Sequence, residues 1–200
     1  MRLAVLLSGR GSNFASIHEA IAKGRLDAEI AAVISNRADA PGIQRARDWG
    51  YDARVIDNRQ FPNRAAHESE IRKVLDEARP DIIVMAGYMR LLSATFVAAW
   101  MNRIVNIHPS LLPSFPGVDA QAQALAHGVK VTGCTVHFVD EGLDAGPIIV
   151  QRTVEVRDDD SVETLSARIL EQEHIAYVDA LRILAAGNYV IEGRRVRRMK

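Results

Sequence analysis

An amide and an imidazole stand two residues apart at the end of an apolar run, at Asn106 and His108. In a β-strand this spacing places both side chains on the same face. Pro109 follows at once and restricts the backbone of His108. An amide can donate to a developing oxyanion, and an imidazole can do the same while it handles protons, so the pair suits acyl or formyl transfer. A structural polar pair at a strand end is the alternative interpretation.

A carboxylate that could act on this imidazole lies further along the chain. The stretch Asp140–Asp144 is acidic and interrupted by Gly142, and Gly146 follows it. Acidic residues in a turn are ordinarily turn formers. Asp144 differs because Gly146 and Pro147 fix the path into the next apolar run. If Asp144 lies near His108, its charge favours the imidazolium and holds the ring in one orientation.

The first apolar run leads into a glycine-rich turn, Ser8–Asn13. Glycines allow a sharp turn that brings backbone N–H groups close to a ligand, and the start of the following helix adds unsatisfied donors. Ser12 and Asn13 can cap this helix or donate to a phosphate. The turn lacks the Gly-Lys-Ser/Thr ending of a nucleoside triphosphatase loop and the third glycine of a dinucleotide fingerprint. It predicts a monophosphate site, with a turn that binds nothing as the alternative.

The elements that must position these residues alternate between short β-type runs and longer helical runs, which is typical of a layered α/β fold. Continuous apolar runs such as Leu3–Leu7 indicate strands buried on both faces of a parallel sheet. We predict a mostly parallel, twisted sheet of about seven strands with helices on both faces. The predicted strands are Arg2–Leu7, Glu29–Ser35, Ala53–Ile56, Ile82–Ala86, Arg103–Ile107, Thr132–Val139 and Ile148–Glu155. The predicted helices are Asn13–Lys23, Ile43–Gly50, Asn63–Ala78, Ser93–Trp100, Ala120–His127 and Ser161–Ala186.

Two further segments have clear signals. The last helix has Ser161 as a candidate N-cap, acidic residues 158–160 near the positive end of its dipole, and Gly187 to end it. The segment Ser110–Asp119 holds several prolines, which exclude a helix or a sheet interior, so we expect a functional loop. No linker or repeat is apparent. We therefore expect residues 1–200 to form a single domain, with a nucleotide-binding half (1–100) and a catalytic half (101–200).

Composition narrows the class of protein. Lys plus Arg equals Asp plus Glu at 25 each, so the basic excess of a nucleic-acid binder is missing. The single cysteine, Cys134, allows neither an internal disulfide nor a cysteine metal cluster. No leader or membrane-spanning run is evident, and we expect a soluble, cytoplasmic protein without membrane partners. The basic end of the chain is expected to be a frayed, solvated tail. It comprises Arg194, Arg195, Arg197, Arg198 and Lys200.

Four stretches in this order resemble the phosphoribosylglycinamide formyltransferase family of folate-dependent enzymes. They are Ser8–Asn13, Ala86–Leu92, Asn106–Pro113 and Gly133–Gly146. The resemblance covers nearly the whole chain. Within the wider superfamily, the Asn-x-His-Pro-Ser-Leu-Leu-Pro run followed by Leu-Asp-x-Gly is highly specific, and the opening Ser-Gly-x-Gly-Ser-Asn points to the glycinamide branch. The resemblance implies a formyltransferase fold with a Rossmann-like N-terminal half.

The resemblance also implies site residues, position by position. It assigns catalysis to a trio, Asn106, His108 and Asp144. It assigns glycinamide ribonucleotide binding to Gly11, Ser12, Asn13 and Glu173. It assigns folate binding to Arg64, Met89, Arg90, Leu91, Leu92, Asn106, Asp140, Glu141, Gly142, Leu143 and Asp144.

One stretch departs from the family pattern. The family commonly has histidine in the loop after Pro116 and Gly117, whereas this chain reads Val-Asp-Ala-Gln over 118–121. Any contribution from a histidine of that loop is therefore absent. His137 lies inside a matching stretch, and we interpret it mainly as a strand residue.

The implied reaction passes the formyl group of 10-formyltetrahydrofolate directly to the amine of glycinamide ribonucleotide, through a tetrahedral intermediate and without a metal. This is a step of de novo purine biosynthesis. Partners are expected to be small molecules, and the chain to be a monomer or a weak homodimer. Methionyl-tRNA formyltransferase and formyltetrahydrofolate hydrolase are expected to carry additional domains. A non-catalytic nucleotide-binding module, which would use only the turn at Ser8–Asn13, is the alternative from another class.

Overall fold

The computed structural model describes residues 1–199, and Lys200 of the predicted basic tail lies outside the described residues. The chain separates into two compact units, residues 1–105 and 106–200. The division falls inside one strand, five residues beyond the boundary expected between the two halves. That the whole chain acts as a single formyltransferase domain stays a prediction.

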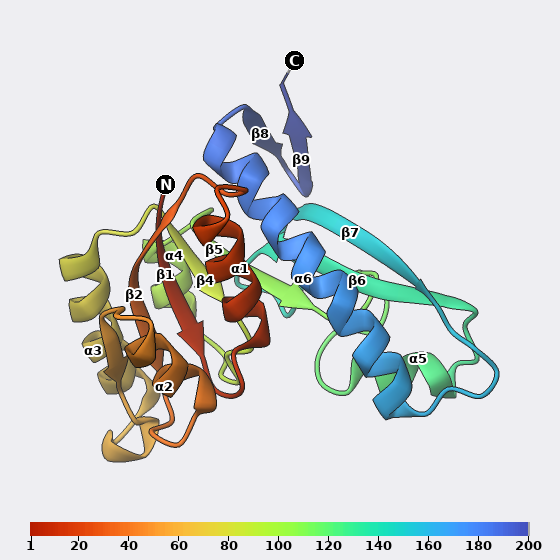
Figure 1. Cartoon of the computed structure of the whole chain (residues 1–200), viewed down its shortest axis with the longest axis horizontal. Helices are drawn as coiled ribbons and strands as arrows, with labels where there is room; N and C mark the ends of the chain where they lie inside the picture. The colour runs from red at the N-terminus through yellow and green to blue at the C-terminus, as the bar shows by residue number, and fades with distance from the viewer. Residues whose placement is uncertain (200) are drawn as a thin grey trace. The chain divides into compact units, whose positions relative to one another are not determined.

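The first unit is a parallel α/β layer (Figure 1). Its strands have the hydrogen-bonded order β3-β2-β1-β4, and each resolved pairing is parallel. The strands are β1 (Arg2–Leu7), β2 (Glu29–Ser35), β3 (Ala53–Val55) and β4 (Ile82–Met85). The helices are α1 (Ser12–Ala22), α2 (Pro41–Asp48), α3 (Arg64–Ala78) and α4 (Ala94–Ala99), with a short 3₁₀ helix at Asn58–Gln60.

The second unit is built on the strand order β5-β6-β7-β9-β8, with the long helix α6 running along β6 and β7 (Figure 1). The strands are β5 (Ile104–His108), which begins in the first unit, β6 (Val131–Phe138), β7 (Ile148–Glu155), β8 (Tyr189–Glu192) and β9 (Arg195–Arg198). The helices are α5 (Ala120–Ala126) and α6 (Val162–Ala186). β6 and β7 are antiparallel, whereas β7 and β9 are parallel, so this unit mixes both kinds of pairing.

Burial explains why the parallel strands form where the sequence predicts them. Every residue of Leu3–Leu7 is completely inaccessible to solvent, and Ile82–Met85 is buried throughout. Burying one such aliphatic side chain contributes about 1.5–3 kcal/mol. The mixed α/β class with a mostly parallel sheet is confirmed, although the structure has nine strands where about seven were expected.

The two additional strands lie in the segment expected to be a frayed tail. β8 and β9 form an antiparallel hairpin in which Ile191 faces Val196, and β9 also pairs with β7 through Arg195 and Ile148. The expectation of a frayed end is therefore wrong for Arg195–Arg198. The arginines at alternate positions remain exposed, while the half-buried Val196 and Ile191 give the hairpin its inner face.

The ends of α6 follow the predicted signals. The Ser161 hydroxyl accepts from the backbone N–H of Thr164, and the Thr164 hydroxyl accepts from the N–H of Ser161, which completes a capping box. Such a cap contributes about 1 kcal/mol. Gly187 ends the helix in the left-handed region with φ of 70°.

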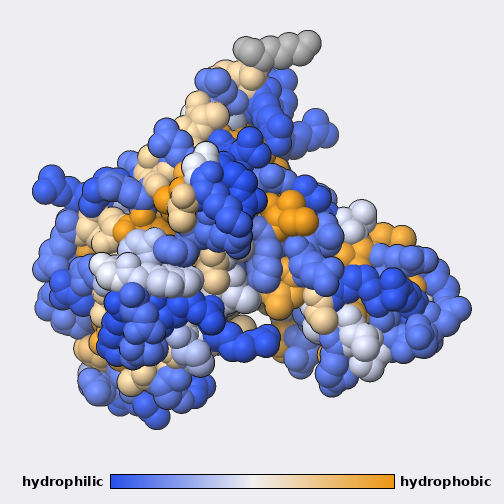
Figure 2. All heavy atoms as spheres, viewed as in Figure 1, coloured by the Kyte–Doolittle hydropathy of each residue, from blue (hydrophilic) through white to orange (hydrophobic). Residues whose placement is uncertain are grey.

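The face of the molecule shown in Figure 2 is mainly polar. Hydrophilic residues predominate on it, and apolar residues form smaller groups. Across residues 1–199, no helix combines the length and the apolar character needed to cross a membrane.

Candidate active site

His108 is the last residue of β5 and is buried, with 5% of its surface exposed. Its Nε2 lies 2.8 Å from the carbonyl oxygen of Phe115, and its Nδ1 lies 3.4 Å from Oδ2 of Asp144. A carbonyl only accepts hydrogen bonds, so Nε2 carries a hydrogen. Both ring nitrogens therefore face oxygen, an arrangement that suits a ring able to donate from both sides.

Asp144 lies on the loop between β6 and β7, and its side chain is only 12% exposed. Its Oδ2 also accepts the backbone N–H of Gly117 at 2.8 Å. The backbone of Asp144 adopts the left-handed region with φ of 50°, which is uncommon for a residue other than glycine. One carboxylate oxygen thus holds both the imidazole of His108 and the loop that follows β5.

The predicted loop 110–119 is confirmed, and a buried hydroxyl holds its first half. Thr135 of β6 is completely buried; its Oγ1 donates to the carbonyl of Ser110 at 2.7 Å and accepts from the N–H of Leu112 at 3.0 Å. The amide of Gln151 on β7 donates to that hydroxyl and to the Leu112 carbonyl. These bonds fix the path that brings the Phe115 carbonyl to His108.

His137 of β6 approaches the same carboxylate. It is 2% exposed, its Nδ1 lies 2.8 Å from the carbonyl of Phe138, and its Nε2 lies 3.8 Å from Oδ1 of Asp144. Burial lowers the pKa of His137, an effect only partly opposed by its contact with Phe138. Nε2 is buried and has no hydrogen-bond partner among the described residues. A neutral His137 that donates from Nδ1 fits these contacts, so this histidine contributes more than a strand position.

Asn106 lies on the same face of β5 as His108 and is half-buried. Within residues 1–199 its side-chain amide makes no hydrogen bond, so the amide is available to a ligand. Residues 140–143 of the acidic stretch are exposed, and within them the N–H of Gly142 donates to Oδ1 of Asp140 at 3.0 Å. Leu143 is 59% exposed.

The predicted phosphate turn forms the start of α1 in the first unit. Gly11 is the N-cap residue, with φ of 68°, and no side chain caps the helix. The expectation that Ser12 or Asn13 caps the helix is therefore wrong, because both lie within its first turn. Gly42 packs against this turn: its N–H donates to the Gly9 carbonyl at 3.0 Å, and its Cα would lie 3.1 Å from a Cβ on Gly11. The turn has a conformation that only glycine adopts readily.

The segment Met89–Leu92 follows β4 as an irregular stretch in the same unit. Ser8 anchors it, because the Ser8 hydroxyl accepts the N–H of Met89 at 2.9 Å and the Ser8 N–H donates to the Gly87 carbonyl at 3.0 Å. Met89 is 80% and Leu91 is 65% exposed. Two large apolar side chains that point into solvent on one short segment are typical of a surface that receives a ligand.

Arg64 and Glu173 lie in contrasting surroundings. Arg64 is exposed in the first turn of α3, where the helix dipole disfavours a cation, and no described carboxylate pairs with it. Glu173 is buried in the middle of α6, with 8% exposure. The pKa of the Cys134 thiol is raised to about 12, mainly because Cys134 is buried and in second place because the charge of Glu173 is near.

Sequence reasoning missed several residues that position this site. Thr135 and Phe115 were not singled out, nor was Gly42. The signal for Thr135 was present, since Gly133, Thr135 and His137 alternate along one strand and so share a face. The contribution of Phe115 comes from its backbone carbonyl, which no residue type reveals. In residues 1–199, no group of three or more His, Cys, Asp or Glu is arranged to hold a metal ion.

Comparisons with known proteins identify relatives of this chain. Residues 1–181 match the formyl transferase family. The chain is 41% identical over 187 residues to phosphoribosylglycinamide formyltransferase from Bacillus subtilis (strain 168), covering 94% of this chain and 96% of that protein. Among solved structures, glycinamide ribonucleotide transformylase 1 from Symbiobacterium toebii superimposes with a TM-score of 0.97 at 50% identity. That superposition covers 100% of this chain and 94% of the other.

The first relatives in the comparison are much longer proteins. The trifunctional purine biosynthetic protein adenosine-3 from Gallus gallus is 46% identical over 187 residues, which span 94% of this chain but only 19% of that protein. The chain thus corresponds to a fraction of the trifunctional proteins and to nearly the full length of the bacterial one.

Proposed function

The chain belongs to the formyl transferase family, and we propose that it passes the formyl group of 10-formyltetrahydrofolate to the amine of glycinamide ribonucleotide. The products are N-formylglycinamide ribonucleotide and tetrahydrofolate. The observation that carries the proposal is the contact between His108 and Asp144, together with Asn106 on the same strand face as His108. An amide donor, an imidazole and a carboxylate are the groups that this transfer requires.

The proposed chemistry is a direct transfer. The neutral amine attacks the formyl carbon, a C–N bond forms, and the carbonyl oxygen becomes an oxyanion. The Asn106 amide and the His108 ring donate to this oxygen, and the charge of Asp144 stabilises the ring while it is protonated. The new ammonium loses a proton, the folate nitrogen gains one, and the bond between that nitrogen and the formyl carbon breaks.

The Phe115 carbonyl has a specific consequence for this scheme. It occupies the hydrogen bond of His108 Nε2, while Nδ1 faces Asp144. A substrate oxygen that accepts from Nε2 must therefore displace the Phe115 carbonyl. Loop 110–119 then has to shift locally before His108 can donate to the oxyanion. The hydrogen bond from Gly117 to Asp144 would keep the loop attached during that shift.

We assign further residues to the binding of the two substrates. The turn at Gly11, Ser12 and Asn13 is assigned to the ribonucleotide phosphate, because the N-terminal end of α1 presents backbone donors and a partial positive charge. Glu173 is assigned to the same substrate. The folate donor is assigned to Arg64, to Met89–Leu92, to Asn106 and to Asp140–Asp144. For Arg64, an unpaired cation suits the carboxylates of the glutamate tail.

The remaining features of the proposal follow from the family. The substrates are small molecules, and we propose that neither nucleic acid nor a membrane is a partner. A cytoplasmic location, a monomer or weak homodimer, and a reaction without metal are parts of the same proposal. Positioning two bound substrates supplies much of the rate acceleration in such a transfer.

A spectrophotometric assay of tetrahydrofolate formation tests the function. We expect product only when 10-formyltetrahydrofolate and glycinamide ribonucleotide are both present. Release of formate without the acceptor would instead indicate hydrolysis of the donor. Tight binding of the ribonucleotide with no turnover would indicate a binding module, and either result would overturn the proposal.

A further inference from the structure

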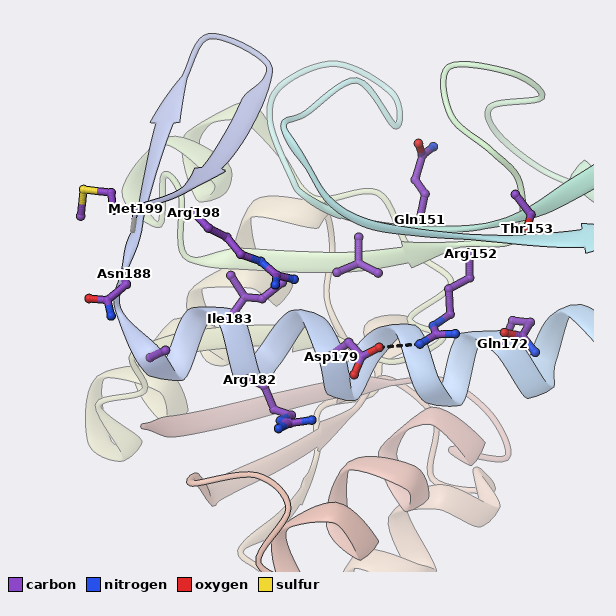
Figure 3. A pocket seen from close by; sticks show the side chains of 12 residues that line it. Gln151, Arg152, Thr153, Gln172, Asp179, Arg182, Ile183, Asn188, Arg198 and Met199 are labelled. Atoms are coloured by element: carbon purple, nitrogen blue, oxygen red, sulfur yellow. Dashed lines mark hydrogen bonds and ion pairs between the residues drawn. The ribbon is translucent and has the colours of Figure 1, made fainter.

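A second hollow lies in the second unit and has no part in the proposed reaction. It is an open groove of about 900 Å³ between β7, the C-terminal half of α6 and the end of β9 (Figure 3). Val150, Ile183 and Ala186 contribute apolar surface to it. None of the residues that line it belongs to the trio or to the other assigned substrate contacts. A groove of this size is in the range of sites for small molecules.

Positive charge dominates the lining. Arg152, Arg182 and Arg198 contribute three guanidinium groups, and Asp179 is the one lining carboxylate among the described residues. The Asp179 carboxylate accepts from Arg152 Nη2 at 2.7 Å, which neutralises one of the three charges. Figure 3 shows this pair side by side, with Arg152 reaching from β7 to α6.

The remaining donors have no acceptor. Neither Arg182 nor Arg198 makes an ion pair or a side-chain hydrogen bond to any described residue, so two full charges remain uncompensated. Arg152 adds a third free donor, because its Nε is buried and has no hydrogen-bond partner in the part of the chain that the structure describes. A buried donor without an acceptor costs free energy.

The arginines that line the groove come from separate segments. Asp179, Arg182 and Ile183 follow one another at helical spacing, so they share a face of α6. Arg198 comes from the hairpin β8–β9, and its side chain extends toward Ile183 in Figure 3. The basic tail of the sequence is therefore not only a solubilising end, since strand pairing places one of its arginines over the groove.

We propose that this groove binds a small phosphorylated molecule that carries at least two negative charges and an apolar or aromatic part. Guanidinium groups match phosphate oxygens in geometry as well as charge. The apolar surface of Val150, Ile183 and Ala186 would contact the organic part of the ligand. The residues that line this site are not those of the proposed phosphate turn at Gly11, and the proposal does not depend on the proposed formyl transfer.

The test measures the binding of adenosine 5′-diphosphate to the groove. Side-chain Nε–H signals in NMR spectra of the full chain report on each arginine, so binding elsewhere does not interfere. We expect saturable shifts for Arg152, Arg182 and Arg198, and weaker binding of inorganic pyrophosphate. Arg182→Ala and Arg198→Ala should each weaken binding about tenfold or more, because a hydrogen bond to a charged group is lost. Arg194→Ala, an exposed neighbour outside the groove, should leave affinity unchanged.

Three outcomes would overturn the proposal. The first is the lack of a saturable shift up to about 1 mM probe. The second is equal affinity for pyrophosphate and the nucleotide, which would indicate an ion site only. The third is equal weakening by Arg194→Ala and by the two groove variants, which would indicate diffuse attraction to the basic hairpin. The variants alter exposed side chains, and their far-ultraviolet circular dichroism should match that of the unmodified chain.

Discussion

Oδ2 of Asp144 lies 3.4 Å from Nδ1 of His108 and accepts the backbone N–H of Gly117 as well. Asp144 and His108 are 36 positions apart, and the antiparallel pair β6–β7 brings them together. The loop that carries Asp144 leaves β6 one residue after His137 and re-enters at β7. The carboxylate therefore controls the orientation of the imidazole and the position of the loop after β5.

Asp144→Asn tests the charge in this arrangement. The substitution keeps the shape of the side chain but removes the negative charge that faces Nδ1 of His108. Losing one oxyanion-stabilising group typically lowers turnover about 10²–10³-fold, and we expect at least that loss here. Steady-state kinetics of the formyl transfer measure it. Asp158→Asn, at an exposed carboxylate paired only with Lys130, should retain full turnover. Near-normal turnover in Asp144→Asn would remove Asp144 from the proposed mechanism.

The sequence revealed most of the fold because the signals were local. The buried run Leu3–Leu7 and the caps of α6 at Ser161 and Gly187 depend on nearby residues alone. The hairpin β8–β9 was missed because its two short strands lack an alternating burial pattern: Tyr189, Val190 and Ile191 are all half-buried, and Val196 is the one half-buried residue of β9.

Residue types and spacing were enough to find the candidate site residues, but the tertiary contacts of the site could not be predicted from them. Spacing placed Asn106 and His108 on one face, and the resemblance singled out Asp144. The carbonyl of Phe115 and the N–H of Gly117 are backbone groups, which any residue would supply. Their positions depend on the buried hydroxyl of Thr135 on another strand. Such long-range backbone contacts leave no signature in residue identity.

His137 should make stability depend on pH. Burial lowers its pKa in the folded chain below the ordinary value of 6.5. Between the folded pKa and 6.5 the unfolded chain binds more protons, so the free energy of unfolding falls as the pH falls through this window. His137→Gln should reduce that dependence in denaturant titrations between pH 7.5 and pH 5.5 (about one unit to either side of the ordinary value). The matched control is His127→Gln, at an exposed site, which should keep the slope of the unmodified chain. An unchanged slope in His137→Gln would contradict the prediction.

Arg64 should affect the folate donor more than the chemical step. Its guanidinium is exposed and unpaired among the described residues, so a contact with the donor's glutamate carboxylates is worth about 0.2–1 kcal/mol. Arg64→Ala is then expected to raise KM for 10-formyltetrahydrofolate about 1.4- to fivefold with little change in kcat. Arg72→Ala, at another exposed arginine of α3, serves as the control. A fall in kcat with an unchanged KM would argue against this assignment.

Cys134 should be unreactive in the folded chain. Burial, followed by the nearby charge of Glu173, raises the pKa of its thiol to about 12, so the thiolate is scarce at neutral pH. We expect labelling by a disulfide reagent at pH 8 to follow unfolding and to accelerate with denaturant. The single cysteine makes the signal unambiguous. An exposed reference thiol, Asp158→Cys in a Cys134→Ser background, should react at the rate of a free thiol. Equal rates for the two thiols in the native chain would refute the prediction.

Gly146 should be intolerant of any side chain because of the strand beside it. A Cβ at this position would lie 1.9 Å from the carbonyl oxygen of Phe138, whose own N–H donates to the Pro147 carbonyl at 2.9 Å. That backbone oxygen cannot retreat without breaking the pairing that holds both ends of the acidic loop. Gly146→Ala is therefore expected to lower the free energy of unfolding by at least about 2 kcal/mol and to reduce turnover by displacing Asp144.

Gly9→Ala, where a Cβ meets nothing within 4 Å, is the control for stability alone and should lower the free energy of unfolding by less than about 1 kcal/mol. Equal denaturation midpoints for Gly146→Ala and the unmodified chain would show that the loop absorbs the Cβ, and the close approach of Phe138 would then not position Asp144.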